Sequence, residues 1–170
     1  GTVLVLGMWL GFSALLVAAA TGVVAAQQGP YAVMPFLTGL GAPDTPGKVM
    51  LLLATFGGLF IGAMVAAAAL HFRGPGTLFG PWGEWRRGFL VALAVLLPLY
   101  GVPTGLSIVL GGVSPNLDPA RWAVLLPLAL PFLFVQIAAE ELFFRGYLQQ
   151  QLAARFASRL VWMVLPSAIF

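Results

Sequence analysis

Long apolar runs separated by short Pro-, Gly- and charge-containing segments make up most of this chain. Four runs cover residues 2–26, 49–72, 88–111 and 122–144, and a fifth starts at residue 160. A helix that crosses a membrane needs about 20 mostly apolar residues, and each of the first four runs is long enough. The pattern predicts an all-α fold, a polytopic transmembrane helix bundle, with an incomplete fifth helix over residues 160–170.

The segments between the runs are "QQGPYAVMPFLTGLGAPDTPGK", "RGPGTLFGPWGEWRR" and "VSPNLDPAR". Their Pro and Gly content predicts irregular loops rather than separate domains. Residues 1–170 are therefore expected to form a single transmembrane domain. After the fourth run, Leu148, Leu152 and Phe156 recur at four-residue steps, which favours extension of that helix to about residue 150. A packed connector is the alternative for this segment.

Composition supports membrane insertion and excludes several other classes. Hydrophobic residues form 61% of the chain and charged residues 8%, whereas a soluble domain carries about 25% charged residues. The net charge of +3 comes from basic residues that do not gather with aromatic residues on one face, so nucleic-acid binding is not expected. Because the chain has no Cys, it has neither disulfides nor thiolate metal sites. Membrane lipids are the expected surroundings.

The distribution of basic residues predicts an orientation. Most Arg residues lie between the second and third runs or after the fourth run, at positions Arg73, Arg86, Arg87, Arg145, Arg155 and Arg159. The positive-inside rule then places these segments, and the N-terminus, in the cytoplasm. The use of Ala, Gly and Arg with a single Lys favours a bacterium with a GC-rich genome, so a bacterial cytoplasmic membrane is the expected location. The first run exceeds the roughly 7–15 apolar residues of a signal peptide and lacks a basic start, so we interpret it as a membrane helix.

Three Gly pairs have the spacing G-x-x-x-G, at residues 7–11, 58–62 and 101–105. This spacing allows two membrane helices to approach closely. With 21 Gly residues in the chain, chance matches are expected. We interpret the pairs as ordinary packing positions in the bundle rather than as a dedicated dimer interface.

Charge is concentrated in one apolar stretch, "AAEELFFRGY", at residues 138–147. An ionised side chain at the centre of a membrane helix costs about 2.5–3.5 kcal/mol, so two adjacent Glu residues are unlikely to be there by chance. On a helix, residues four apart share one face, which predicts an ion pair between Glu141 and Arg145. Successive residues are turned by about 100°, so Glu140 faces elsewhere.

Spacing alone leaves two interpretations of this cluster. If Glu140 faces a partly dry cavity, its carboxylate is suited to act as a general base. Alternatively the segment is a helix end, where Glu141 and Arg145 form an interfacial ion pair and Glu140 points to water.

The stretch "EELFFRG" after an apolar helix resembles the first motif, Glu-Glu-x-x-x-Arg, of the CAAX protease and bacteriocin-processing family, also called the Abi family. The segments "HFRGPGTLFGPW" and "LPSAIF" are also similar to bacterial members. The resemblance implies an intramembrane endopeptidase in which Glu140 activates water for attack on a peptide bond. It implies supporting roles for Glu141 and Arg145.

The resemblance also assigns Phe170 to the second motif of the family, Phe-x-x-x-His. The His of that motif and the third motif, His-x-x-x-Asn, would follow residue 170. The chain is therefore expected to be the N-terminal part of a longer domain, and its status as an enzyme depends on those motifs. No metal or other cofactor is expected, since two adjacent Glu residues and the distant His71 lack a usual ligand set. We interpret His71 as an interfacial residue.

Two alternatives belong to other functional classes. In the first alternative, the chain lacks catalytic activity and binds a membrane-protein partner, as an immunity factor or accessory subunit of the same fold would. In the second alternative, the chain is a fragment of a transporter whose Glu pair couples proton movement to transport. The endopeptidase hypothesis instead requires a peptide or protein substrate.

Overall fold

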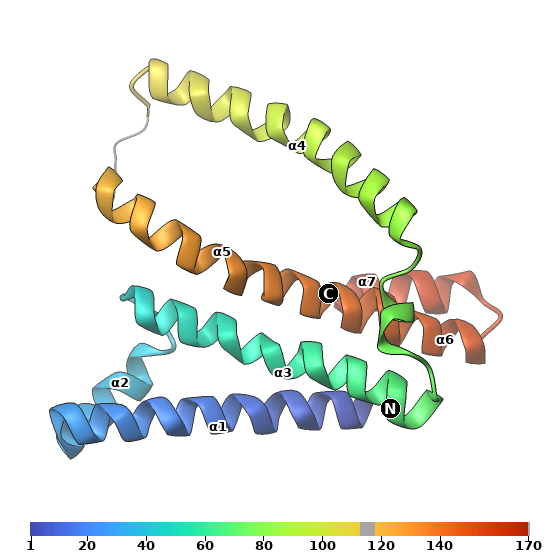
Figure 1. The fold of residues 1–170 in the computed structure, drawn as a ribbon, viewed down its shortest axis with the longest axis horizontal. Coiled ribbons are helices and arrows are strands. Elements are labelled where there is room, and N and C mark those ends of the chain that lie inside the picture. The colour runs from blue at the N-terminus through green and yellow to red at the C-terminus, as the bar shows by residue number, and fades with distance from the viewer. Residues whose placement is uncertain (113–117, 170) are drawn as a thin grey trace. The chain divides into compact units, whose positions relative to one another are not determined.

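The computed structural model describes residues 1–112 and 118–169, and every regular element in that part of the chain is a helix. This confirms the predicted all-α class. Four helices in the described residues are long and apolar enough to cross a membrane (Figure 1): Thr2–Gln28, Pro46–His71, Trp82–Val109 and Pro119–Arg155. The chain is an integral membrane protein by these features.

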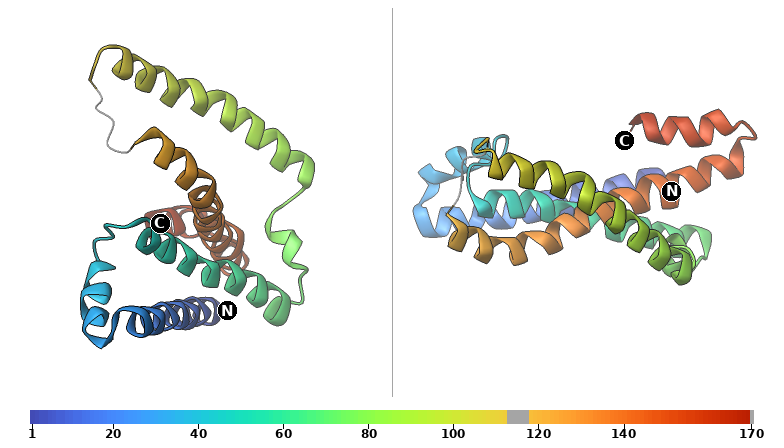
Figure 2. Two further views of the ribbon diagram at one scale, coloured as in Figure 1. Left: turned by 60° about the vertical axis from the view of Figure 1, so that its left-hand side comes forward. Right: turned by 90° about the horizontal axis from the view of Figure 1, so that it is seen from above.

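The long helices are α1 (Thr2–Gln28), α3 (Pro46–His71), α4 (Trp82–Val109) and α5 (Pro119–Glu141). The helix that starts with α5 continues without a break through the π-helix η3 (Leu142–Leu148) and α6 (Gln149–Arg155). The chain then turns back through a second π-helix, η4 (Leu160–Val164), and α7 (Leu165–Ile169). Figures 1 and 2 show this return as a helical hairpin. Shorter helical turns are η1 (Pro30–Ala32), α2 (Val33–Gly39) and η2 (Pro75–Leu78).

The structure contains helical residues in each of the three predicted loops. The segment after the first run contains η1 and α2, because Pro30 occupies the first position of η1, where its fixed φ angle suits a helix. The helix α4 starts at Trp82 instead of residue 88. The charged residues in the first turns of α4 precede the apolar run but are still helical. Glu84 in the first turn complements the helix dipole. The predicted loop at 113–121 lies partly outside the described residues, and its last three residues, 119–121, belong to α5 instead.

The helices α1 and α3 pack side by side (Figures 1 and 2), and two Gly residues of α3 permit this contact. A Cβ atom added to Gly58 would lie 2.7 Å from Phe12 Cβ and 3.0 Å from Trp9 Cα. One added to Gly62 would lie 3.1 Å from the carbonyl oxygen of Val5. The packing interpretation of the 58–62 pair is confirmed, whereas nothing lies within 4 Å of a Cβ added to Gly7 or Gly11.

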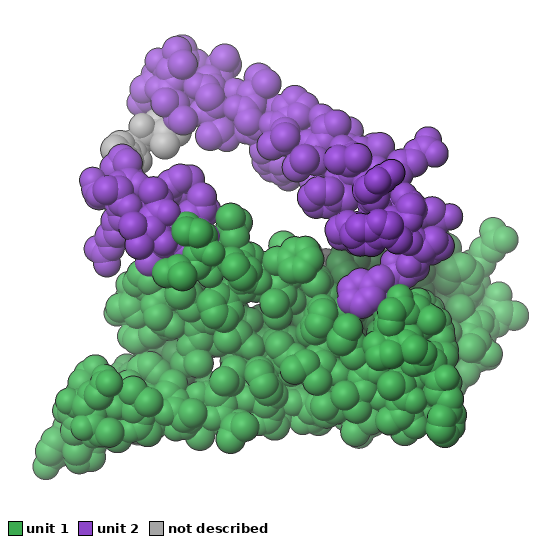
Figure 3. All heavy atoms as spheres, in the orientation of Figure 1, with its two compact units in different colours: residues 1–78, 127–170 green, residues 79–126 purple. Residues whose placement is uncertain are grey.

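The chain divides into two compact units (Figure 3): residues 1–78 with 127–170, and residues 79–126. The single transmembrane domain expected over residues 1–170 stays a prediction. In the first unit, the buried core is concentrated where the second half of α3 meets η3. Its members are Val5, Leu59, Ala63, Ala66, Ala67, Leu78, Ala139, Leu142, Phe143 and Tyr147. The second unit consists of α4 and the first turns of α5.

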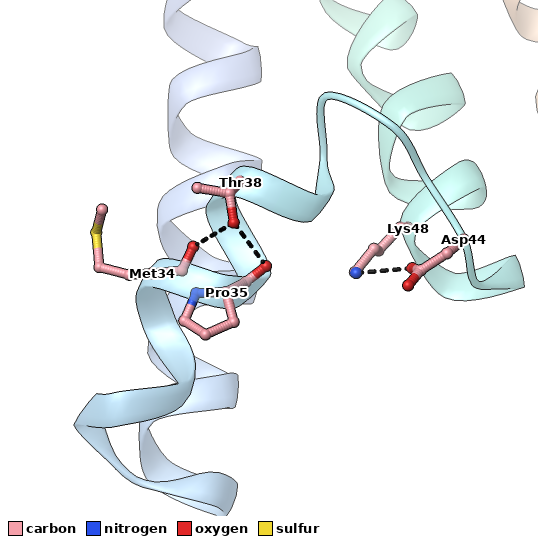
Figure 4. A network of polar contacts seen from close by, with 5 residues as sticks. All are labelled: Met34, Pro35, Thr38, Asp44 and Lys48. Atoms are coloured by element: carbon pink, nitrogen blue, oxygen red, sulfur yellow. Dashed lines mark hydrogen bonds and ion pairs between the residues drawn. The ribbon is translucent and has the colours of Figure 1, made fainter.

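The start of α3 carries an ion pair whose titration can be tested. Lys48 Nζ donates a hydrogen bond of 2.7 Å to Asp44 Oδ1 (Figure 4). This hydrogen bond and the Lys48 charge lower the pKa of Asp44 below its ordinary value of about 4. Because the folded-state pKa is lowered, the stabilisation by this pair is present above about pH 4 and is lost as the pH falls through the folded-state value.

We expect Lys48→Met to raise the pKa of Asp44 toward its ordinary value, measured by an NMR pH titration of its carboxyl carbon. Thr38→Val is a matched control on the same side of the bundle, because the Thr38 hydroxyl donates only to backbone carbonyl oxygens of α2. An Asp44 pKa that does not change in Lys48→Met would contradict the pairing.

Candidate active site

The two Glu residues of the charged cluster lie at the end of α5. Glu140 follows Pro119, the first residue of α5, after a helical length of about 32 Å at about 1.5 Å per residue. The hydrocarbon core of a bilayer is about 30 Å thick. Glu140 and Glu141 therefore lie about one bilayer thickness from the start of α5.

Glu141 and Arg145 form the ion pair that the four-residue spacing predicted. Arg145 Nη1 lies 2.8 Å from Glu141 Oε2, and the side chains are 69% and 39% exposed, respectively. An ion pair this exposed contributes about 1 kcal/mol or less to stability. Its main effect is to hold the Glu141 carboxylate in one direction.

Glu140 has a different environment. It is half-buried and follows the fully buried Ala139. Within the described part of the chain, Glu140 forms no ion pair and no side-chain hydrogen bond. Its carboxylate is thus partly shielded from solvent without being neutralised by a cation.

A half-open cavity of about 340 Å³ lies between η3 and the returning segment of η4 and α7. Its walls combine the ion pair with apolar and uncharged polar side chains. They are Glu141, Phe144, Arg145, Gln149, Met163, Pro166 and Ser167. The cavity therefore lies on the Glu141 side of the helix. A cavity beside Glu140 stays a prediction.

The π-helix η3 begins immediately after Glu141. Its inner face consists of Leu142, Phe143, Gly146 and Tyr147, all buried. Gly146 permits a close approach, because a Cβ there would lie 3.3 Å from the carbonyl oxygen of Leu78 in η2. Short π-helical segments within α-helices occur frequently at functional sites.

Two polar contacts join η3 and α6 to the end of α3. His71 Nε2 and Tyr147 Oη are 2.9 Å apart, and their rings are tilted with centroids 5.6 Å apart. Arg73 Nη1 donates a 2.6 Å hydrogen bond to Gln150 Oε1. These contacts place the end of α3 level with the turns that follow the Glu pair.

From the sequence, His71 was interpreted as an interfacial residue, and Tyr147 was not identified as its partner. Both residues are part of a tertiary contact between positions far apart in the chain. The local sequence offers a Gly-Tyr dipeptide, Gly146 and Tyr147, at the end of the stretch that carries the charged cluster.

The segment that carries the Glu pair matches a known family. Residues 121–170 match the family described as type II CAAX prenyl endopeptidase Rce1-like. The predicted resemblance to CAAX proteases is confirmed. The matched range begins in the first turn of α5 and includes Glu140, Glu141 and Arg145. Neither the curated proteins nor the solved structures contain a significant match to the chain.

Other expectations from the CAAX protease resemblance are not tested. Phe170, assigned to the second motif, lies outside the described residues. The described residues contain no group of three His, Asp or Glu side chains that could hold a metal ion. The roles assigned to Glu140, Glu141 and Arg145 stay predictions.

Proposed function

We propose that this chain forms part of a CAAX-type intramembrane endopeptidase that hydrolyses a peptide bond in a membrane-associated peptide or protein. The observation that carries the proposal is the Glu-Glu-x-x-x-Arg segment inside the matched family range. In that segment Arg145 pairs with Glu141, whereas Glu140 has no cationic partner among the residues that the structure describes.

In the proposed reaction, Glu140 accepts a proton from a water molecule as the water oxygen attacks the peptide carbonyl carbon. The peptide C–N bond then breaks, and Glu140 returns the proton to the leaving amine nitrogen, which leaves a carboxyl group on the other product. A general base must reach that proton directly or through one water molecule. A carboxylate near the membrane boundary meets this requirement, because water is available there and the half-buried position limits its full hydration. Glu141 and Arg145 act as supports that keep the adjacent turn in one conformation.

The proposal includes a membrane orientation. The contacts of His71 with Tyr147 and of Arg73 with Gln150 put Arg73 and the Arg residues after Glu141 at the same end of the first unit. By the positive-inside rule this end is cytoplasmic. A cytoplasmic active-site entrance in a bacterial inner membrane follows.

Incubation of the full-length protein in liposomes with a panel of membrane-anchored peptides tests the activity. The panel contains prenylated and unprenylated versions of each peptide, and the reaction is run in water enriched in oxygen-18. We expect cleavage products whose new carboxyl group carries the heavy isotope, detected by mass spectrometry. Stable peptide binding without cleavage would favour a non-catalytic partner protein, and proton-driven uptake would favour a transporter.

A further inference from the structure

We propose that His71 and Tyr147 are positioning residues, an inference that rests on the proposed function. Their hydrogen bond holds η3 in its π-helical form and thereby fixes the direction of Glu140 in the preceding turn. Neither side chain is assigned to the reacting atoms.

The π-helix changes how the buried residues around the Glu pair line up along the helix. Ala139, Phe143 and Tyr147 follow one another at four-residue steps and are 0%, 4% and 2% exposed. In an α-helix, each four-residue step turns about 40° past a full circle, so Tyr147 would be rotated about 80° from Ala139. Hydrogen bonds from i to i+5 widen the turn and reduce this rotation. The π-helix thus brings the three buried residues closer to one line along the helix, where an α-helix would spread them over about 80° of the buried face.

Tyr147 is the residue that holds η3 in one rotational position. Its ring is buried in the core, and its hydroxyl group reaches His71 Nε2 at the last residue of α3. With 2% of Tyr147 exposed, water cannot easily replace His71 as a partner. A buried polar group that loses its partner is costly, so the contact favours one rotational position of η3.

The same contact controls Glu140 through the backbone. If η3 relaxed to an α-helix, Tyr147 would rotate relative to the turn that contains Ala139 and Glu140. Tyr147 would then keep its contact with His71 only if that turn rotated instead, and this rotation would redirect the Glu140 carboxylate. A misplacement of about 1 Å in a catalytic group can lower the rate by about 100-fold, so a modest rotation is sufficient to reduce turnover.

Kinetics of four variants of the full-length protein in liposomes test the inference. They are Tyr147→Phe, His71→Leu, the double variant and His71→Gln. We expect each of the first two to lower kcat by about tenfold, with KM changed by less than about twofold. The double variant should be no slower than the slower single variant, because both changes remove one contact. His71→Gln retains a hydrogen-bonding side chain and should restore part of kcat.

Tyr31→Phe is the matched control, since Tyr31 is 94% exposed, and its kcat should equal that of the wild type. Hydrogen exchange of the backbone amides in residues 139–148 provides a readout besides activity. We expect faster exchange there in Tyr147→Phe, whether or not His71→Leu folds.

The outcomes separate the two proposals. Unchanged kcat in Tyr147→Phe, with wild-type hydrolysis intact, would overturn the positioning role even if exchange became faster. Additive losses in the double variant would also overturn it, because the two side chains would then act independently. Absence of hydrolysis by the wild-type protein would overturn the proposed function itself.

Discussion

Replacing Glu140 with Gln should lower kcat for peptide hydrolysis by at least about 100-fold, the usual contribution of a general base. The amide has nearly the same shape as the carboxylate but cannot accept a proton from the attacking water. Because Glu140 forms no ion pair within the described residues, the substitution should leave the fold intact. Steady-state kinetics of the purified full-length protein in liposomes measure this loss.

Glu84→Gln is the matched control for this experiment. Glu84 lies in the first turn of α4, and it is the remaining Glu of the chain. The Glu84→Gln variant should retain wild-type kcat. This result would show that loss of a Glu charge alone does not abolish turnover. Hydrolysis by Glu140→Gln at a rate within about twofold of the wild type would refute the base assignment.

The sequence predicted the parts of the site that depend on local geometry. The ion pair between Glu141 and Arg145 follows from their four-residue spacing on a helix, and the structure contains it. The long apolar runs likewise located the four membrane-length helices. Both predictions rely on helical periodicity and on the thickness of the bilayer, which a single sequence is enough to apply.

Features that depend on tertiary contacts were not predictable in the same way. A π-helix has no distinct hydrophobic pattern, and η3 depends on Tyr147 meeting His71 from another helix. Similarly, the Gly pairs at 7–11 and 58–62 have the same spacing, yet only the second lies against a neighbouring helix within the first unit. Which face of α1 is turned toward α3 is decided by packing, not by the motif.

Gly58→Ala should destabilise the first unit by about 1–3 kcal/mol, the usual cost of adding atoms to a well-packed contact. The added Cβ would lie 2.7 Å from Phe12 Cβ and 3.0 Å from Trp9 Cα. Trp9 Cα is part of the α1 backbone and Phe12 Cβ is bonded to it, so a change of rotamer cannot relieve the clash. The helices must instead move apart, which also weakens the packing of Val5 against Gly62. Thermal unfolding in detergent micelles measures the loss.

Gly7→Ala in α1 separates this clash from the intrinsic effect of the substitution. Nothing lies within 4 Å of a Cβ at Gly7, and Ala favours a helix over Gly by about 1 kcal/mol. Gly7→Ala should therefore match or exceed the stability of the wild type. If Gly58→Ala behaved in the same way, α1 and α3 would not be in the close contact described, and the core that supports η3 and the Glu pair would need a different arrangement.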